Sequence, residues 1–353
     1  LSQVVKTKMK IIADISLRDI DNLFSILDGF EDFSVKYLET NNIKHEFIYD
    51  ADILLVRSQT LINEKLLSSS NIKWIGSATA GVDHIDIKFL ESKNINWFNA
   101  QGCNAYSVCN YVLSSLYELK KDKIYKNTDM LGIVGYGNIG KRLKSILDNL
   151  NIKNIAYDPF VNNKSLSTID ELLKAEIISI HVPLTFDTKY PTHTMINESF
   201  LNKSKCHSVI NTSRGGIVSE PSVIGRKLNY IADVWEGEPS LNINLLNHCH
   251  IATPHIAGHS FEGKVNGTID ILIALMRYLN FDESTVNKNL KIIEGFYPPQ
   301  KNYYLDLKDF NNNYDISKES KNFKDKFKKY PQNNFNKIRA CHPKRHDLSV
   351  YNI

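Results

Sequence analysis

Three segments of this chain each place a reactive side chain directly after a run of apolar residues. Arg214 follows VINTS, Glu238 lies in IADVWEGEP, and His255 ends HIATPH. Together they could oxidise a hydroxyl group by hydride transfer. Histidine titrates in the range useful for taking the hydroxyl proton, and a carboxylate on its other ring nitrogen fixes the tautomer. An arginine can hold a substrate carboxylate through two parallel hydrogen bonds. Each residue has an ordinary structural explanation when taken singly, but the set favours catalysis.

The stretch NHCHIATPHIAGHS, residues 247–260, could also hold a metal. Its histidines and cysteine follow none of the structural zinc spacings. His248 and His250 precede a short strand, on which alternate side chains point to opposite faces. The Ala-Gly pair between His255 and His259 disfavours a helical pair of ligands. We therefore predict no metal, and His255 as the single proton carrier.

The motif GYGNIG follows the apolar strand LGIV and opens the amphipathic helix KRLKSILDNL, which is the context of a dinucleotide-binding turn. Gly135 permits the tight turn, Gly137 lets the backbone approach a pyrophosphate, and Gly140 allows the helix to pack close to the strand. The free N–H groups of the helix start, at Asn138 and Ile139, would face the phosphates.

Asp158 lies at the end of the next predicted strand, about 18 residues after the last glycine of the motif. A carboxylate at this position accepts hydrogen bonds from a ribose and repels a 2′-phosphate. Pro159 and Phe160 follow it, and neither could bind a phosphate as an arginine would. The sequence therefore predicts NAD rather than NADP as cofactor.

Strands that alternate with helical sequence must position these residues, and this order predicts parallel, doubly wound α/β sheets. Residues 9–15, 51–58 and 73–86 supply apolar strands of a first α/β unit. A second unit opens at MLGIVGYG and runs to HIATPH, with enough strands for one sheet of at least six. Ligands bind beyond the carboxyl ends of such strands, where the three reactive residues stand.

Composition narrows the remaining classes of protein. The chain has 353 residues and a formal charge of +4, which calls for neither nucleic acid nor a membrane surface. Five cysteines without CxxC spacing indicate a reducing, cytoplasmic location. No apolar run reaches the length of a membrane span. Residues 1–8 are expected to be a disordered extension.

The composition changes near residue 289 to Asn, Lys and Tyr, which marks a third, smaller region. Within it, Lys318–Tyr330 is basic with interleaved aromatic residues, as in some nucleic-acid binders. However, Phe323, Phe327 and Tyr330 recur at i, i+4 and i+7. A helix that buries one aromatic face explains this spacing better.

The stretches NTSRGGIV, DVWEGEP and TPHIAG resemble the NAD-dependent D-2-hydroxyacid dehydrogenases. The resemblance extends over nearly everything after Met9. It implies a Rossmann NAD-binding domain, 102–269, inserted into a flavodoxin-like substrate domain, 9–101 and 270–288. FNKIRACHPKRHDLSVY resembles the small α+β dimerisation domain of one branch of this family, so residues 289–353 are expected to form a homodimer interface.

The resemblance also assigns roles, with Arg214, Glu238 and His255 as the catalytic set. Ser58, Thr79 and His259 would contact a small phosphorylated 2-hydroxy acid, and from its charge we expect Arg57 to help bind the phosphate. Contacts to NAD are implied, besides the glycine loop, for Asp158, Val182, Thr212, Ser213, Arg214, Asp233 and Gly258.

Three departures from the family pattern stand out. His259 replaces a tyrosine, Val182 replaces a threonine, and the segment between Val218 and Asp233 is shortened. That segment leaves at most about two helical turns, with Gly225 inside. Alternatives therefore stay open: a dehydrogenase for phosphoglycerate or glycerate, an enzyme weakened by the short segment, or a corepressor-like NAD-binding protein.

Overall fold

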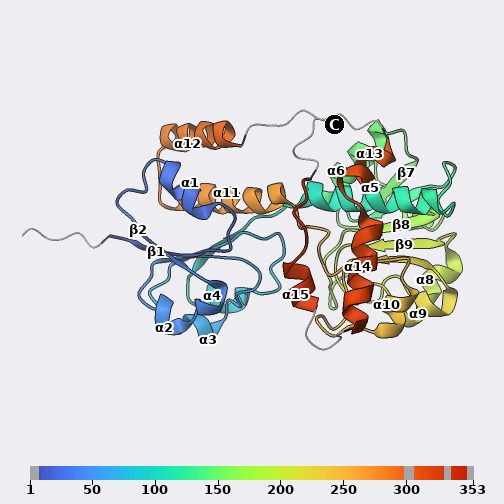
Figure 1. Cartoon of the computed structure of the whole chain (residues 1–353), viewed down its shortest axis with the longest axis horizontal. Helices are drawn as coiled ribbons and strands as arrows, with labels where there is room; N and C mark the ends of the chain where they lie inside the picture. Colours follow the sequence, from blue (N-terminus) through green and yellow to red (C-terminus); the bar gives the residue numbers. More distant parts are fainter. Residues whose placement is uncertain (1–7, 298–305, 330–334, 348–353) are drawn as a thin grey trace, which may run out of the picture. The chain divides into compact units, whose positions relative to one another are not determined.

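The computed structural model describes residues 8–297, 306–329 and 335–347, so all but one residue of the expected N-terminal extension lies outside it. The chain forms two compact units (Figure 1). The first comprises residues 1–104 and 261–300, and the second comprises 105–260 and 301–353. Within the described ranges, no helix is long and apolar enough to span a membrane.

The first unit is built on a five-stranded parallel sheet with the order β2-β1-β3-β4-β5, which is the flavodoxin-like order. Helices α1, α11 and α12 lie on one face, and α2, α3 and α4 lie on the other (Figure 1). Because both faces are covered, the central strands β3 and β4 are buried at every position. The strands are β1 (Lys10–Asp14), β2 (Ser34–Leu38), β3 (Ile53–Val56), β4 (Trp74–Ser77) and β5 (Asn96–Asn99). The helices are α1 (Ile20–Ile26), η1 (Thr40–Asn42), α2 (His45–Ile48), α3 (Glu64–Leu67), α4 (Ile87–Ser92), α11 (Phe261–Tyr278) and α12 (Glu283–Phe296).

The second unit contains a six-stranded parallel sheet with the order β11-β10-β9-β8-β6-β7, as expected from the spacing of apolar segments. The chain order reverses between β6 and β8, so a ligand crevice is expected at their carboxyl ends. The strands are β6 (Leu131–Val134), β7 (Asn154–Tyr157), β8 (Ile177–Ile180), β9 (Ser208–Asn211), β10 (Asn229–Ala232) and β11 (Ile251–Ala252). The helices between residues 105 and 260 are α5 (Ala105–Lys121), α6 (Asn138–Asn149), α7 (Ile169–Leu172), α8 (Glu198–Lys203), α9 (Glu220–Arg226) and α10 (Ile243–His248).

Helix α11 places the boundary at which the chain returns to the first unit at a different residue from the one expected. It runs unbroken from Phe261 to Tyr278 and packs on β4 and β5 of the first unit. A Cβ added at Gly267 would lie 2.8 Å from the carbonyl oxygen of Ala78, so the helix approaches the sheet closely. The first unit therefore resumes at residue 261 and not at 270, because one continuous helix belongs to one core.

We call residues 289–353 the tail. It also differs from the expected α+β domain. Residues 289–296 complete α12 in the first unit, and the described residues from 306 onward belong to the second unit. Those residues, 306–329 and 335–347, form helices and no strand, where an α+β domain was expected. The helices are α13 (Leu307–Asn313), α14 (Ile316–Lys329) and α15 (Phe335–Ala340).

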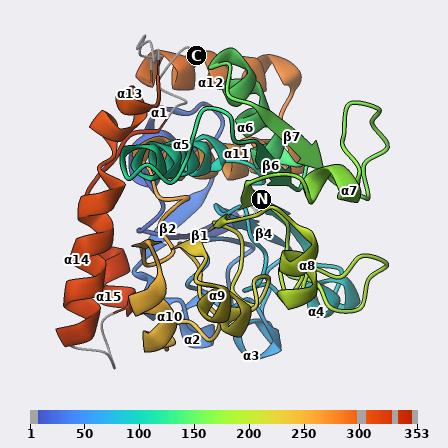
Figure 2. The same cartoon turned by 90° about the vertical axis from the view of Figure 1, so that its right-hand side faces the viewer.

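Helix α14 covers the edge of the second sheet (Figure 2). The backbone N–H of Ala252, on the two-residue edge strand β11, donates to Oγ of Ser320 at 2.9 Å. Phe323 and Phe327 are fully buried, and the Phe323 ring packs against Trp235. The aromatic spacing of the tail thus marks a packed face that protects a sheet edge. Tyr330, the third aromatic of the pattern, lies outside the described residues.

Helix α9 is the shortened element between Val218 and Asp233. It has seven residues, Glu220–Arg226, or about two turns, and it contains Gly225 as expected from the sequence.

Replacing Gly225 with alanine should stabilise the protein by about 0.5–1 kcal/mol, because glycine in a helix costs backbone entropy. A Cβ at this position meets nothing within 4 Å. Urea unfolding followed by circular dichroism would measure the change. The matched control is Gly267→Ala in α11, which should destabilise because its Cβ meets the Ala78 backbone. Equal effects of the two substitutions would contradict this interpretation of α9.

Candidate active site

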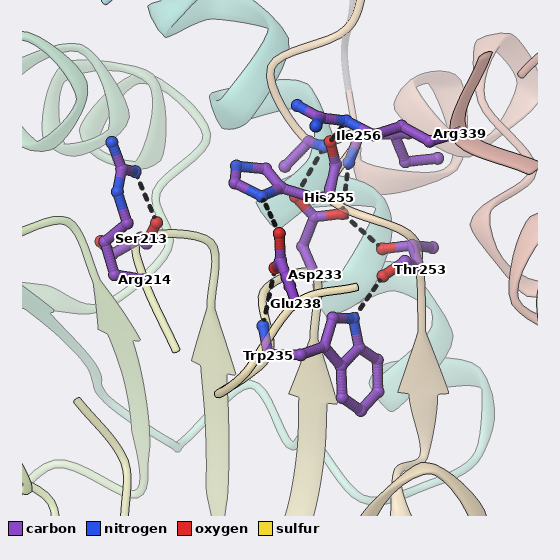
Figure 3. A network of polar contacts seen from close by, with 10 residues as sticks. Ser213, Arg214, Asp233, Trp235, Glu238, Thr253, His255, Ile256 and Arg339 are labelled. Atoms are coloured by element: carbon purple, nitrogen blue, oxygen red, sulfur yellow. Dashed lines mark hydrogen bonds and ion pairs between the residues drawn. The ribbon is translucent and has the colours of Figure 1, made fainter. Parts of the chain in front are cut away.

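His255 and Glu238 form a hydrogen-bonded pair at the carboxyl ends of β11 and β10 (Figure 3). Nδ1 of His255 lies 2.8 Å from Oε2 of Glu238, and the side chains are 30% and 24% exposed. The other carboxylate oxygen accepts from the backbone N–H of Trp235 at 2.9 Å. An ionised carboxylate can only accept, so Nδ1 carries the proton. The lone pair of Nε2 is then available to receive the proton of a substrate hydroxyl.

The backbone at His255 is held in an unusual conformation. Its φ of 57° is in the left-handed region, which disfavours residues with a Cβ. Strand β11 ends at Ala252, before Thr253 and Pro254, and the His255 N–H donates to the backbone carbonyl of Asp233 at 2.7 Å. Such a conformation persists where the surrounding structure fixes it.

The carboxylate of Asp233 fixes that surrounding structure. It is buried, with a relative exposure of 1%. Oδ1 accepts from Oγ1 of Thr253 and from the N–H of Ile256, both at 2.7 Å, and Oδ2 accepts from the N–H of Ala257 at 2.8 Å. Asp233 thus binds the chain on both sides of His255 (Figure 3). Both carboxylate oxygens of Asp233 thus already have partners in the chain. A contact from Asp233 to NAD stays a prediction.

Thr253 joins two further residues to this network. It donates to Asp233, so the hydroxyl of Tyr111 donates to Thr253, at 2.7 Å. The indole N–H of Trp235 donates to the Thr253 carbonyl at 2.9 Å. The sequence motifs contain Trp235 and Thr253, but nothing in them pointed to Tyr111, which comes from α5.

Arg214 stands on the loop after β9, next to β10 in the sheet. Nη1 donates to the carbonyl of Ser213 at 2.7 Å. A Cβ added at Gly215 would lie 2.1 Å from the carbonyl carbon of Trp235, so this loop touches the backbone of the Glu238 loop. Three adjacent strands therefore place Arg214, Glu238 and His255 at one edge of the sheet, as predicted (Figure 3).

The glycine loop borders a cavity of about 450 Å³ in the second unit. Gly135 has a φ of 97°, and a Cβ there would lie 2.4 Å from the His181 carbonyl oxygen. By contrast, a Cβ at Gly137 would meet nothing within 4 Å. Helix α6 begins at Asn138, with Ile139 in its first turn, so its free N–H groups lie at the loop. These features fit the phosphates of a dinucleotide.

Asp158 lines the same cavity at the end of β7. Its carboxylate accepts from the backbone N–H groups of Tyr136 at 2.9 Å and Phe160 at 3.0 Å. Two bonds leave lone pairs for ribose hydroxyls, because a carboxylate has about four acceptor positions. The cavity lining contains Val182 and no arginine, and it includes a lysine, Lys189, whose Nζ lies 5.2 Å from the centre of the Tyr190 ring. This chemistry suits NAD and disfavours a 2′-phosphate.

His181 also lines the cavity, although the motifs gave no reason to select it. Its Nε2 lies 2.9 Å from Oγ of Ser179. Enclosure of the ring lowers the pKa of His181 to about 3, so the ring is neutral at physiological pH. It therefore brings no positive charge to the cavity.

Thr212 and Ser213 hold the loop before Arg214. Oγ of Ser213 donates to the Ile180 carbonyl at 2.8 Å, and Oγ1 of Thr212 lies 3.4 Å from Nδ1 of His181. Gly258 lies in the loop after His255. Contacts of these residues to NAD stay predictions.

The expected substrate residues Arg57, Ser58 and Thr79 stand at the carboxyl ends of β3 and β4, in the first unit. Thr79 Oγ1 lies 2.9 Å from Oγ of Ser77, and it donates to the Gly81 carbonyl at 3.2 Å. His259 lies four residues after His255 in the second unit. Their roles in substrate binding also stay predictions.

The other histidines around residue 250 have separate partners. Nε2 of His248 lies 3.0 Å from the Leu228 carbonyl, and Nε2 of His250 lies 3.0 Å from Oδ2 of Asp122. Cys249 is buried, and burial raises the pKa of its thiol. Across the described residues, no group of three or more possible ligands could hold a metal ion.

Replacing Gly137 with alanine should weaken NAD binding about 10-fold while leaving the melting temperature of the free protein within 2 °C or so. The added methyl meets no protein atom within 4 Å, yet it stands where a pyrophosphate must approach the backbone. Calorimetric titration with NAD and a thermal melt would measure both quantities. Unchanged NAD affinity would contradict this position for the phosphates.

Comparison with known proteins agrees with this geometry. Residues 117–257 match the D-isomer specific 2-hydroxyacid dehydrogenase, NAD binding domain. The erythronate-4-phosphate dehydrogenase of Marinomonas sp. is 38% identical over 300 residues, covering 82% of this chain and 78% of that protein. The enzyme of the same name from Acinetobacter baylyi is 35% identical over 97% of this chain and 99% of its own length.

Solved structures share the fold. The NAD⁺-bound 3-phosphoglycerate dehydrogenase of Entamoeba histolytica superposes with a TM-score of 0.65 at 26% identity, covering 78% of this chain and 96% of that one. The D-lactate dehydrogenase of Aquifex aeolicus superposes with a TM-score of 0.57 at 21% identity, covering 81% and 98%. With an NAD-binding domain and relatives of this identity over most of its length, the chain belongs to the D-isomer specific 2-hydroxyacid dehydrogenase family.

Proposed function

We propose that the protein oxidises 4-phospho-D-erythronate at its 2-hydroxyl group, giving 3-hydroxy-2-oxo-4-phosphooxybutanoate, in the biosynthesis of pyridoxine 5′-phosphate. The observation that carries the proposal is the set of relatives named erythronate-4-phosphate dehydrogenase, 35–39% identical. One of them aligns over nearly its whole length. The paired His255 and Glu238 supply the acid–base group that such an oxidation needs.

Each reactive residue of the second unit then has one role in the reaction. Nε2 of His255 takes the proton of the 2-hydroxyl, and Glu238 stabilises the resulting imidazolium through Nδ1. Arg214 binds the substrate carboxylate and so orients the carbon that is oxidised. Bound NAD would supply the acceptor for the hydride. The glycine loop, Asp158 and the neutral His181 form the surroundings that hold it.

The remaining contacts belong to the same proposal. Arg57 would bind the substrate phosphate, and Ser58, Thr79 and His259 would contact the rest of the substrate. Imidazole at His259 can donate a hydrogen bond, as a tyrosine hydroxyl can, but with a shorter reach. We also propose a homodimer formed through the tail and a cytoplasmic location, in keeping with five cysteines that are all free.

An assay of NADH absorbance tests the proposal. Purified protein should reduce NAD with 4-phosphoerythronate, with kcat/KM at least about 100-fold above that with 3-phosphoglycerate. NADP should be a poor substitute because of Asp158. The reverse reaction, with the 2-oxo acid and NADH, should be measured as well. A higher kcat/KM for 3-phosphoglycerate would favour the second candidate, whose fold and cofactor the Entamoeba structure shares.

A further inference from the structure

The tail of the chain holds the segment that carries the catalytic histidine. We call residues 255–260 the catalytic loop. Arg345 is 5% exposed, and its Nε donates to the His259 carbonyl at 2.7 Å. Nη2 donates to the carbonyls of Ile256, at 3.0 Å, and Ala257. One buried guanidinium thus binds three carbonyls of this loop, from 86 to 89 residues away in sequence.

Two further tail residues bind the ends of the catalytic loop. Nε of Arg339 donates to the carbonyl of His255 itself at 3.1 Å (Figure 3). Oγ of Ser260 donates to Oδ2 of Asp347 at 2.7 Å, and both groups are buried. Every residue of the catalytic loop except Gly258 therefore has a hydrogen bond to a described residue of the tail.

The contacts of the tail complement those of the sheet. Asp233 accepts from the N–H groups of Ile256 and Ala257, and Arg345 donates to the carbonyls of the same two residues. A negative and a positive group therefore fix the loop through opposite ends of its peptide units. Both sets of bonds are charge-assisted, which makes them shorter and stronger than neutral ones.

The position of Arg345 indicates more than packing. A buried charge is costly, and hydrogen bonds to the guanidinium offset that cost. Nη2 also donates to Oγ of Ser107 at 2.7 Å, so its two hydrogens are shared with the carbonyls of the loop, whereas the buried Nη1 has no hydrogen-bond partner among the described residues. The guanidinium stacks over the Tyr314 ring, 4.1 Å from the ring centre. A rigid fork of donors suits a set of fixed carbonyls better than a lysine would. The left-handed backbone of His255 requires such support.

We propose that Arg345, assisted by Arg339 and Asp347, is a positioning residue that holds His255 in its catalytic orientation. The tail then acts in catalysis within its own subunit, apart from any role in dimerisation. This inference rests on the proposed function for its kinetic test and on the structure alone for its physical test.

The test uses full-length protein with Arg345→Met, Arg345→Lys and Arg339→Met. The matched control is Lys324→Met, because Lys324 also joins the tail to a carbonyl, that of Cys249, outside the catalytic loop. Turnover of 4-phosphoerythronate gives kcat and KM, and calorimetric titration gives the Kd for NAD. Hydrogen exchange of the peptide 253–260, with 135–146 as reference, reports on the loop without any substrate.

Arg345→Met should lower kcat roughly 10- to 100-fold, since small misplacements of catalytic groups have effects of this size. The Kd for NAD should stay within about twofold, and the amides of Ile256 and Ala257 should exchange faster. Arg345→Lys should recover part of kcat. Arg339 is half-buried, so we expect Arg339→Met to fold. This variant should show the same pattern with a smaller loss of kcat.

Wild-type exchange and kcat in both Arg345→Met and Arg339→Met would overturn the proposal. An equal loss in Lys324→Met would overturn it too, because the tail would then merely stabilise the fold. Wild-type protein that fails to turn over 4-phosphoerythronate would instead refute the proposed function, and hydrogen exchange would still decide the positioning role.

Discussion

Replacement of His255 by glutamine should lower kcat by roughly 10²–10⁴-fold, the contribution of a positioned general base. Glutamine preserves a polar side chain of similar length but cannot take the hydroxyl proton. The Kd for NAD should change little, because the His255 side chain is not among the predicted cofactor contacts. Steady-state kinetics and calorimetric titration would separate the two effects.

The matched control for this substitution is His250→Gln. His250 lies five residues away on the same segment and pairs with Asp122 rather than with Glu238. It should keep kcat within about twofold, because its partner is Asp122 and not a residue of the proposed catalytic set. Retention of more than about a tenth of wild-type kcat by His255→Gln would exclude His255 as the base.

Replacement of Asp233 by asparagine should destabilise the protein by about 3–5 kcal/mol. The carboxylate accepts three hydrogen bonds in a buried position. In asparagine an NH₂ group replaces one carboxylate oxygen. This group cannot accept a hydrogen bond, so at least one of the three buried donors loses its partner. Chemical unfolding would measure the free energy, and a fall in melting temperature of the order of 10 °C should accompany it.

Asp158→Asn provides the comparison for Asp233→Asn. Asp158 also accepts two backbone N–H groups, but it borders the cavity instead of the core. Its replacement should change stability by less than about 1 kcal/mol and weaken NAD binding. If both variants lost stability equally, Asp233 would not have the organising role that its contacts indicate.

The position of the three reactive residues could be predicted from sequence because parallel sheets obey a simple rule. Strands that all run in one direction end at one edge, so residues that follow them meet there. Arg214, Glu238 and His255 each follow a strand, and β9, β10 and β11 are neighbours in the sheet. The pairing of His255 with Glu238 was expected from their chemistry and is present at 2.8 Å.

Other features had no local signal. The spacing of Phe323 and Phe327 indicated a buried face, but nothing in the sequence said that it covers the edge strand β11. Arg345 and Arg339 looked like ordinary basic residues of a polar tail. Their importance comes from contacts with carbonyls 84 to 89 residues earlier. Backbone carbonyls exist at every residue, so no sequence pattern marks the ones that an arginine binds.

The hold of the tail on the catalytic loop has a consequence for the order of events during synthesis. The ribosome completes Arg345 about 90 residues after His255, or roughly 5–20 s later at usual elongation rates. Until then the growing chain already contains its glycine loop and all three reactive side chains, but not the groups that fix the loop of His255. We expect kcat to stay roughly 10- to 100-fold low, as in Arg345→Met, until the segment that carries Arg345 has been made and has packed on the loop. A product that ends before Arg345 should therefore bind cofactor but turn substrate over slowly.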